Sequence, residues 1–543
     1  MSVATAARDR VKNLLVEGVF DNPVVTREFR TRMRGWKAFM IMGGYVLFVA
    51  GIQFIVYINI WSSRSSGPGG GLMLVDRNVG MELFRYLAWT QAILLTLIIP
   101  SLTFSSLTQE IERKTMEMLA LTRLSPGKTV VGKQLAGFLY ALILLICTIP
   151  LASMCLMLGG ISPAEIGAWY LELTAWCFLL TCAGVFWSSL FARTAAAALF
   201  TYGTAVFYFL ATIPFGALTV APFFGGSSNP HVLGALNPGW ASFTSVLTAN
   251  VCSVKAPLWI VAVGLHVAIG VLVLLVASTH VKYQRAERAL PIRIMLIGIT
   301  AALIWLLVGN LTAMGGVPST QQYTLDLVGV VSSVILAFVS LLICSVATGE
   351  VKRKPGQSVL GYGLSVMRIF KGDLGGAVPF VFVWMALVYA AFAGTLEWLM
   401  RSQGSHLSAA VWISLCEVGV SLVAMAVGIA AVGVLSSCCV RHRRNAAALV
   451  LLFLILVFSG YGIVMVYYVD GLTVTRGPVW QLAAFWPMTP ILSSTNEWRS
   501  MPRLWWSSDH SWIVCSGAYL AIALVSLALG SRALSRYGGV KEE

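Results

Sequence analysis

The sequence predicts an all-α, polytopic integral membrane protein with about twelve transmembrane helices in two halves. The prediction depends on composition, on the spacing of apolar stretches and on the placement of basic residues. Of the 543 residues, 58% are hydrophobic and only 11% are charged, and the mean hydropathy is +0.82. Soluble domains carry about 25% charged residues, so this chain has too few charges to cover a water-exposed surface. Soluble enzymes, nucleic-acid binders, disordered chains and disulfide scaffolds are therefore excluded as descriptions of the whole chain.

Apolar stretches recur along the chain at the length of a membrane span. A bilayer core about 30 Å thick requires a helix of about 20 residues. The stretches that meet this length are 38–61, 83–107, 133–158, 167–191, 195–220, 257–281, 291–314, 324–347, 374–398, 408–436, 446–469 and 511–534.

The basic residues are distributed unevenly between the two sides of these spans. The net charge is +15, and most of the 37 Lys and Arg residues lie on the same side as the N-terminus. Because basic loops remain in the cytoplasm, we expect a bacterial cytoplasmic membrane protein with both termini cytoplasmic. The excess charge then contacts anionic membrane lipids and is not a nucleic-acid site. No Cys/His spacing suits zinc, and we expect no metal site.

Residues 1–37 are predicted to be a cytoplasmic N-terminus that contains an interfacial amphipathic helix over 22–37. Asn22 suits an N-cap and Pro23 the first helical position. An apolar stripe with basic residues around it is typical of a helix in the headgroup plane. The alternative is a juxtamembrane anchor with no moving role. The apolar stripe is Val25, Phe29, Met33 and Trp36, and the basic residues are Arg27, Arg30, Arg32, Arg34 and Lys37.

The segment 108–133, between the second and third predicted spans, has a second amphipathic pattern. Met116, Leu119, Ala120 and Leu124 form an apolar face at helical spacing, and Pro126 ends the run. A short cytoplasmic helix has to bury such a face, either on the bilayer surface or in another protein.

These residues resemble the type-2 permeases of ATP-binding-cassette (ABC) transporters. That family commonly carries Glu-basic-Glu-x-Gly-Thr-Leu-Glu-Leu-Leu, then Thr-Pro-Leu-Ser-Pro, then Gly-Lys-x-Leu. Here Lys114 stands where Gly is usual, and Arg123 where the first Pro is usual. The resemblance covers most of residues 20–285 and includes Asn22-Pro23 and Arg27-Glu28. The matching residues of the segment are Thr115, Glu117, Leu119, Leu121, Thr122, Leu124, Ser125, Pro126, Gly132, Lys133 and Leu135.

The resemblance implies the transmembrane permease subunit of an ABC transporter, of the exporter type. It implies a cytoplasmic ABC ATPase partner in two copies, with ATP and Mg bound to that partner and no cofactor on this chain. Gly127-Lys128-Thr129 lacks the first Gly of a phosphate loop, so we expect no enzymatic activity from this chain. The implied ATPase-coupling residues are Glu112, Thr115, Glu117, Leu119, Leu121, Leu124, Ser125 and Pro126. The implied interfacial-helix residues are Pro23, Arg27, Glu28, Phe29, Arg30 and Trp36.

Matches in the same order predict two six-span modules, over 38–285 and over 286–543 with more divergence. Thr108–Thr115 corresponds to Thr348–Pro355, and Arg193–Leu199 to Arg444–Leu449. Six spans per module make the two repeats parallel. The second loop lacks the Thr-x-Glu-x-Leu-Leu run, and Pro355 interrupts its helix. The second half therefore either contacts an ATPase differently or is a degenerate copy.

Two acidic residues lie inside predicted spans at corresponding positions of the modules. Ionisable groups in a membrane are expensive, and therefore Glu172 and Glu417 are candidates for a substrate path. The alternatives are that Glu172 reaches interfacial water and that Glu417 bonds a neighbouring helix. His266, in the sixth span, is interpreted as a packing histidine.

Two other classes of protein remain open. A secondary carrier would also have two parallel six-helix repeats, and it predicts more intramembrane charge than the sequence shows. An integral membrane enzyme needs clustered His, Asp or Glu at a membrane face. The chain has only six scattered histidines, which disfavours an enzyme.

Overall fold

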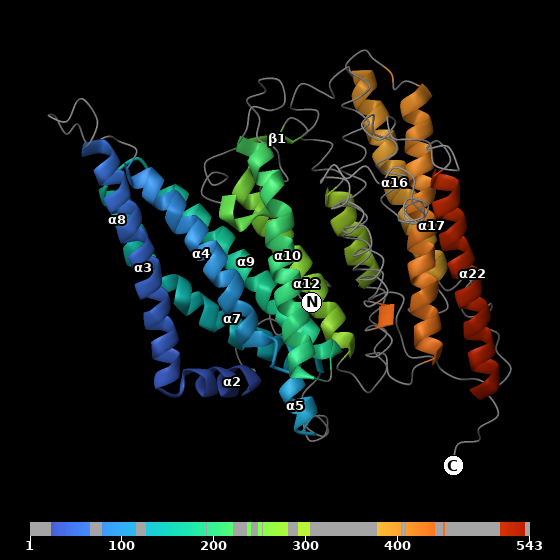
Figure 1. The fold of residues 1–543 in the computed structure, drawn as a ribbon, viewed down its shortest axis with the longest axis horizontal. Coiled ribbons are helices and arrows are strands. Elements are labelled where there is room, and N and C mark those ends of the chain that lie inside the picture. The colour runs from blue at the N-terminus through green and yellow to red at the C-terminus, as the bar shows by residue number, and fades with distance from the viewer. Residues whose placement is uncertain are drawn as a thin grey trace, which may run out of the picture. The chain divides into compact units, whose positions relative to one another are not determined.

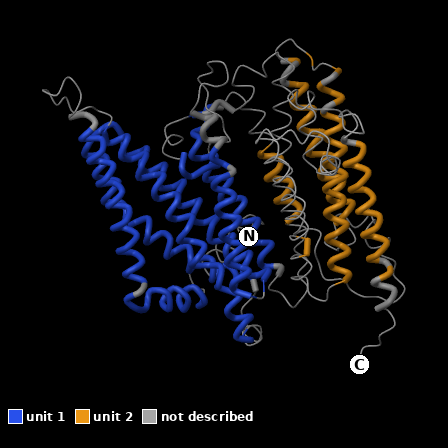
Figure 2. The backbone as a smooth tube through the Cα atoms, in the orientation of Figure 1, with its two compact units in different colours: residues 1–285 blue, residues 286–543 orange. Residues whose placement is uncertain are grey.

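The computed structural model describes residues 23–65, 79–115, 126–191, 193–220, 236–240, 248–251, 254–280, 292–303, 377–402, 406, 409–439, 449–450 and 511–537. The chain divides into two compact units, Met1–Arg285 (unit 1) and Ala286–Glu543 (unit 2) (Figure 2). Among the described residues each unit consists mainly of helices, most of them long (Figure 1).

The first described helix of unit 1 is the short α2 (Pro23–Met33), which extends sideways from the lower end of α3 (Trp36–Ser65) in Figure 1. The helices that follow are α4 (Val79–Thr103), α5 (Thr108–Glu112), α7 (Pro126–Cys147), α8 (Ile149–Met157), α9 (Pro163–Leu190) and α10 (Thr194–Val220). A one-turn 3₁₀ helix η3 (Pro238–Trp240), the antiparallel strands β1 (Thr248–Val251) and β2 (Val254–Pro257), and α12 (Leu258–His280) complete the unit.

The core of unit 1 forms around α4 and α9, which pack against each other and against α7 and α10. Large side chains from these helices are fully buried, among them Phe84, Leu95, Trp169 and Trp176. The ring centroids of Phe84 and Trp169 lie 4.9 Å apart in an edge-to-face arrangement, which aromatic pairs favour. By contrast, α3 is peripheral, and one side of it exposes Leu47, Phe48 and other apolar residues.

Unit 2 contains the helix Ile292–Leu303, α16 (Ala377–Ser402), α17 (Ala409–Cys439) and α22 (Ser511–Tyr537) among its described residues. Helix α17 packs against both α16 and α22. The indole Nε1 of Trp384 on α16 donates to Thr300 Oγ1 at 3.3 Å, which joins α16 to the helix Ile292–Leu303.

Eight of the described helices are long and apolar enough to cross a membrane. They correspond to eight of the predicted spans, so the prediction of a helical, multi-pass membrane protein is confirmed. The fifth and seventh predicted spans appear as helices with shorter apolar parts, Thr194–Leu210 and Ile292–Leu303. The predicted span 324–347 lies outside the described residues, as does 446–469 apart from residues 449–450. The number twelve therefore stays a prediction.

Two helices begin several residues before the predicted spans that they contain. The fourth span begins at Pro163, because Ser162 and Glu165 form a capping box in which each side chain bonds the other residue's backbone N–H. The third begins at Pro126, which is the first residue of α7, as suits proline at a helix start. The β1–β2 ribbon is also an addition to the all-helical prediction.

Candidate functional site

A buried lysine connects three helices at the end of unit 1 where α5 lies, called here the α5 end. Lys133 is on α7, and its side chain is only 3% exposed. Its Nζ lies 3.1 Å from Glu28 Oε1 on α2 and 2.8 Å from Glu110 Oε1 on α5. It also donates to the Ser106 carbonyl at 2.7 Å. The ammonium group thus donates two hydrogen bonds, to Glu28 and to Ser106, and forms a second ion pair with Glu110, which compensates its burial. We call Glu28, Glu110 and Lys133 the Lys133 cluster.

Helix α2 is positioned by a face that points into unit 1. Val24 and Val25 are buried, and α2 packs along α7. Arg32, one turn after Glu28, is half-buried, and its partial burial lowers its pKa while the nearby Glu28 carboxylate opposes the shift. Its Nη1 lies 3.6 Å from where a Cβ on Gly137 of α7 would lie.

The structure corrects the predicted interfacial helix in two respects. The helix does not continue through residue 37, because Gly35 adopts φ +121° and the chain turns there into α3. Trp36 therefore belongs to α3. The predicted apolar stripe also does not point outward, because Val25 is buried within unit 1, and Phe29 and Met33 are half-buried. Pro23, Arg27 and Arg30 are exposed.

The short helix α5 leads from α4 into the predicted ATPase-coupling segment. Ser188 Oγ on α9 accepts from the backbone N–H groups of Leu107 and Thr108 at 2.8 and 3.0 Å. These bonds satisfy donors that the start of α5 leaves open. Glu112 Oε1 accepts from the backbone N–H of Thr194 at 2.7 Å, so this carboxylate caps α10.

Helix α5 ends in a Schellman motif. Lys114 adopts φ 56°, and it is the one non-glycine residue with positive φ among the described residues. Its N–H donates to Ile111 O at 3.1 Å, and the Thr115 N–H donates to Glu110 O at 2.9 Å. This pair of bonds defines the motif. Of the predicted coupling residues, Glu112, Thr115 and Pro126 are described, whereas Glu117, Leu119, Leu121, Leu124 and Ser125 lie outside the described residues.

A second polar group lies deep within unit 1. Glu172 on α9 is fully buried, which excludes the reading that it reaches interfacial water. It interacts electrostatically with Tyr208 on α10. The Tyr208 hydroxyl lies 3.2 Å from His266 Nε2 on α12, and that nitrogen lies 3.3 Å from the Leu236 carbonyl. We call Glu172, Tyr208 and His266 the Glu172 cluster. His266 has hydrogen-bonding contacts, in agreement with its interpretation as a packing histidine.

The turn that contains η3 is held among the helices beside the Glu172 cluster. Asn237 Nδ2 donates to Phe209 O at 2.8 Å and to Thr212 Oγ1 at 2.9 Å, and Asn237 Oδ1 accepts from Gly239 N. A Cβ on Gly239 would lie 2.6 Å from the Trp89 ring. Only glycine therefore fits this turn without displacement of its neighbours.

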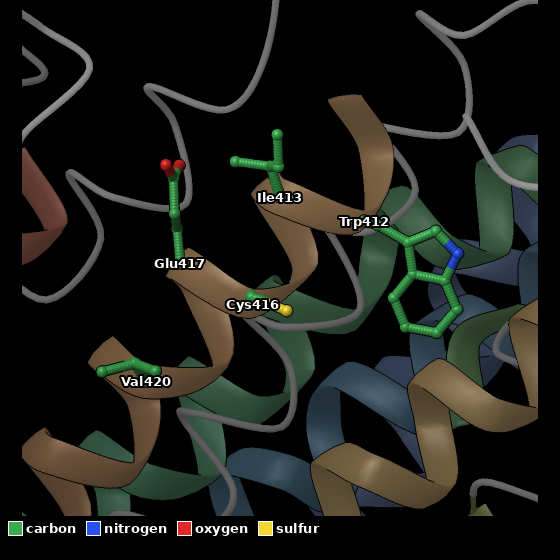
Figure 3. Close-up of a pocket in the computed structure, with 5 residues that line it drawn as sticks. All are labelled: Trp412, Ile413, Cys416, Glu417 and Val420. Carbon is green, nitrogen blue, oxygen red and sulfur yellow. The ribbon is translucent and has the colours of Figure 1, made fainter. Parts of the chain in front are cut away.

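The counterpart carboxylate, Glu417, has different surroundings. It is half-buried on α17 and lines a shallow apolar depression in unit 2 (Figure 3). Trp412, Ile413, Cys416 and Val420 form the rest of the depression. Glu172 and Glu417 thus lie a similar distance from the starts of α9 and α17, but Glu172 is fully buried whereas Glu417 is half-buried.

Lys133 was missing from the predicted site residues, although it forms the largest number of charged contacts at the α5 end. Its signal in the sequence was one lysine near the start of an apolar span, with acidic residues in two other segments predicted for the same side. No protein-family model matches the chain, and no curated protein matches it either.

Proposed function

We propose that the chain is the permease subunit of an ABC transporter of the exporter type, driven by a separate cytoplasmic ATPase. The observation that supports this most is the Lys133 cluster. The segment 115–126, which carries the type-2 permease pattern, runs between α5 and α7. Lys133 on α7 binds Glu110 on α5, so the two ends of that segment are held together at one end of the unit.

In this proposal the α5 end faces the cytoplasm, and the ATPase contacts segment 115–126. A displacement of the segment by the ATPase would be transmitted to α5 and α7, because the segment connects these two helices in the chain. Through α5 it would also reach α4. The same ion pairs join α2 to these helices. Two copies of the ATPase, with ATP and Mg bound to them, would drive the two halves of one bacterial cytoplasmic membrane protein.

The proposed duplication has support in the packing within each unit. In unit 1, α9 packs against α7 and α12, and in unit 2, α17 packs against α16 and α22. These are the third, fourth and sixth predicted spans of each module. A shared order of neighbours is what a repeated six-span module predicts.

The proposal is tested by co-expression of the chain with an ABC ATPase from a neighbouring gene. We expect a stable complex whose ATP hydrolysis depends on the ATPase subunit. Replacing Leu119 or Leu124 with Asp puts a charge in a contact that excludes water, at about 3 kcal/mol or roughly 150-fold in Kd. Leu119→Met is the matched control and should keep the complex.

The same pull-down distinguishes the two halves. A charge at Val351 in the second-half loop should have less effect, because Pro355 interrupts that helix. Equal losses from both loops would show that the halves are functionally symmetric. Retention of the ATPase by all Asp variants would overturn the coupling assignment.

A proton-coupled secondary carrier is the second candidate, and the Glu172 cluster favours it. A carboxylate, a phenol and an imidazole from three helices meet where Glu172 and His266 are fully buried, and such groups form proton pathways in carriers. Proteoliposomes that contain the chain alone distinguish the two classes. Transport driven by a pH gradient without ATP, and lost in Glu172→Gln, would favour the carrier.

A further inference from the structure

The outward face of α2 and the residues after it form a row of arginines. Arg27, Arg30 and Arg34 are all exposed; Arg27 and Arg30 are neighbours on the surface of α2, and Arg34 directly follows the helix. Thr26 and Thr31 are exposed as well, and Thr31 Oγ1 bonds the Arg27 carbonyl at 2.8 Å. We call Arg27, Arg30 and Arg34 the arginine face.

The arginine face lies next to a surface that suits the edge of a membrane. Directly after the Gly35 turn, Trp36, Phe39 and Met40 at the start of α3 are 69%, 64% and 63% exposed. An exposed tryptophan at the start of an apolar span lies at the headgroup level. Because α2 extends sideways from the lower end of α3, where Trp36 begins that helix (Figure 1), we place the arginine face at this same level.

The outward side of α2 carries positive charge that no acidic residue of the helix itself balances. Glu28 is the only acidic residue between Pro23 and Trp36, and it binds Lys133 on the inward side. The arginines of the outward face thus have no acidic residue of α2 on their own side of the helix. Phosphate groups of anionic lipids satisfy arginine in pairs of hydrogen bonds, and they are concentrated at this level of the cytoplasmic leaflet.

We propose that the arginine face binds anionic phospholipid headgroups, and that this contact regulates coupling to the ATPase. Glu28 directly follows Arg27 in α2 and pairs with Lys133 on α7. A shift of α2 toward or away from the headgroups therefore displaces Glu28. That displacement reaches α5 through the Glu28–Lys133 and Lys133–Glu110 ion pairs, of 3.1 and 2.8 Å. The lipid contact stands by itself, whereas its effect on turnover rests on the proposed function.

The lipid contact is tested first, with the full chain in nanodiscs of mixed phosphatidylglycerol and phosphatidylcholine. Native mass spectrometry then measures which lipid the released protein retains. Each arginine contributes about fivefold to the preference for anionic lipid, so Arg27→Gln, Arg30→Gln and Arg34→Gln together should reduce it by about 100-fold. The triple Arg→Lys variant should keep most of the preference because the charge remains.

The matched control removes three other basic residues from the same end of the unit. Arg113, Lys114 and Lys128 are exposed, and they lie outside α2. Their combined replacement by Gln should leave the preference for phosphatidylglycerol within about twofold of the unchanged chain. An equal loss in both triple variants would show that only total charge matters, and it would overturn the arginine face as a site. An unchanged preference in the arginine variant would overturn it too.

The regulatory part is tested with the ATPase complex in nanodiscs of each lipid alone. We expect turnover to be several-fold higher in phosphatidylglycerol, and Glu28→Gln to abolish this difference while lipid retention persists. Equal turnover in both lipids refutes the regulation and leaves the lipid contact in place. If no ATPase binds any variant, the proposed function fails, but the retention result remains valid. If the arginine variant loses the ATPase in lipid-free detergent, the face binds an acidic protein surface and the lipid proposal is wrong.

Discussion

The replacement Lys133→Met tests the cluster that joins α2, α5 and α7. Methionine keeps most of the side-chain volume of lysine and removes the ammonium group. The variant loses two ion pairs and the bond to the Ser106 carbonyl. It leaves Glu28 and Glu110 without this cation, but their side chains are 25% and 18% exposed, so water can partly solvate them.

The expected cost follows from that exposure. Removing one partner of a fully buried ion pair costs about 3–5 kcal/mol, and partial solvation of the two carboxylates reduces this to about 2–3 kcal/mol. The two single variants Glu28→Gln and Glu110→Gln should each cost about 1–2 kcal/mol, because Lys133 keeps one carboxylate. The double variant should cost about 1 kcal/mol more than their sum, since the ammonium group, which is 3% exposed, then has no carboxylate at all.

The assay measures the reactivity of buried thiols during thermal unfolding in detergent. Cys155, Cys177 and Cys182 are buried in unit 1, so their labelling by a thiol-reactive dye reports the opening of this unit. Lys128→Met is the matched control, because Lys128 is exposed on the same helix, and it should change stability by less than about 0.5 kcal/mol. Equal effects of Lys133→Met and Lys128→Met, or strict additivity of the two glutamate variants, would refute the reasoning.

Two further replacements test close contacts of the backbone. Gly239→Ala should destabilise unit 1 by about 1–3 kcal/mol, because its Cβ would lie 2.6 Å from the Trp89 ring. Gly264→Ala is the control in the same thiol assay, because the space around Gly264 is open. Equal effects of the two replacements would contradict the close fit at Gly239. Lys114→Gly should stabilise the end of α5 by about 1 kcal/mol, since glycine adopts positive φ freely. Slower hydrogen exchange of the Thr115 amide would show this stabilisation, and faster exchange would contradict it.

The sequence was sufficient to predict the eight long apolar helices of the described residues, because length and apolarity alone define them. It was less successful at their ends. The start of α9 at Pro163 follows from Ser162 and Glu165, whose spacing is readable in the sequence as a capping box. The hydropathy of residues 167–191 does not include that signal, so the predicted span began too late.

The partners of the charged residues could not be predicted, for a physical reason. The face that a helix turns inward is readable from the sequence only when apolar and polar residues separate around it. Helix α9 is apolar on all sides, with 78% of its most apolar window buried, so nothing in the sequence indicated that Glu172 is buried near Tyr208. In the same way, Lys133 and Glu28 are 105 residues apart, and only the packing of α2 on α7 brings them together.

Lys114 shows how a departure from a family pattern is judged by backbone conformation. Type-2 permeases usually have Gly where this chain has Lys114. Here the position is C′ of a Schellman motif, with φ 56° and both of the hydrogen bonds that define the motif. The motif requires a left-handed residue, which glycine supplies without strain and lysine supplies at about 1 kcal/mol. The substitution therefore changes the energy of this turn and leaves its geometry intact. For this reason the departure at Lys114 does not weigh against the resemblance. A proline or a β-branched residue at this position would weigh against it, because neither adopts positive φ readily.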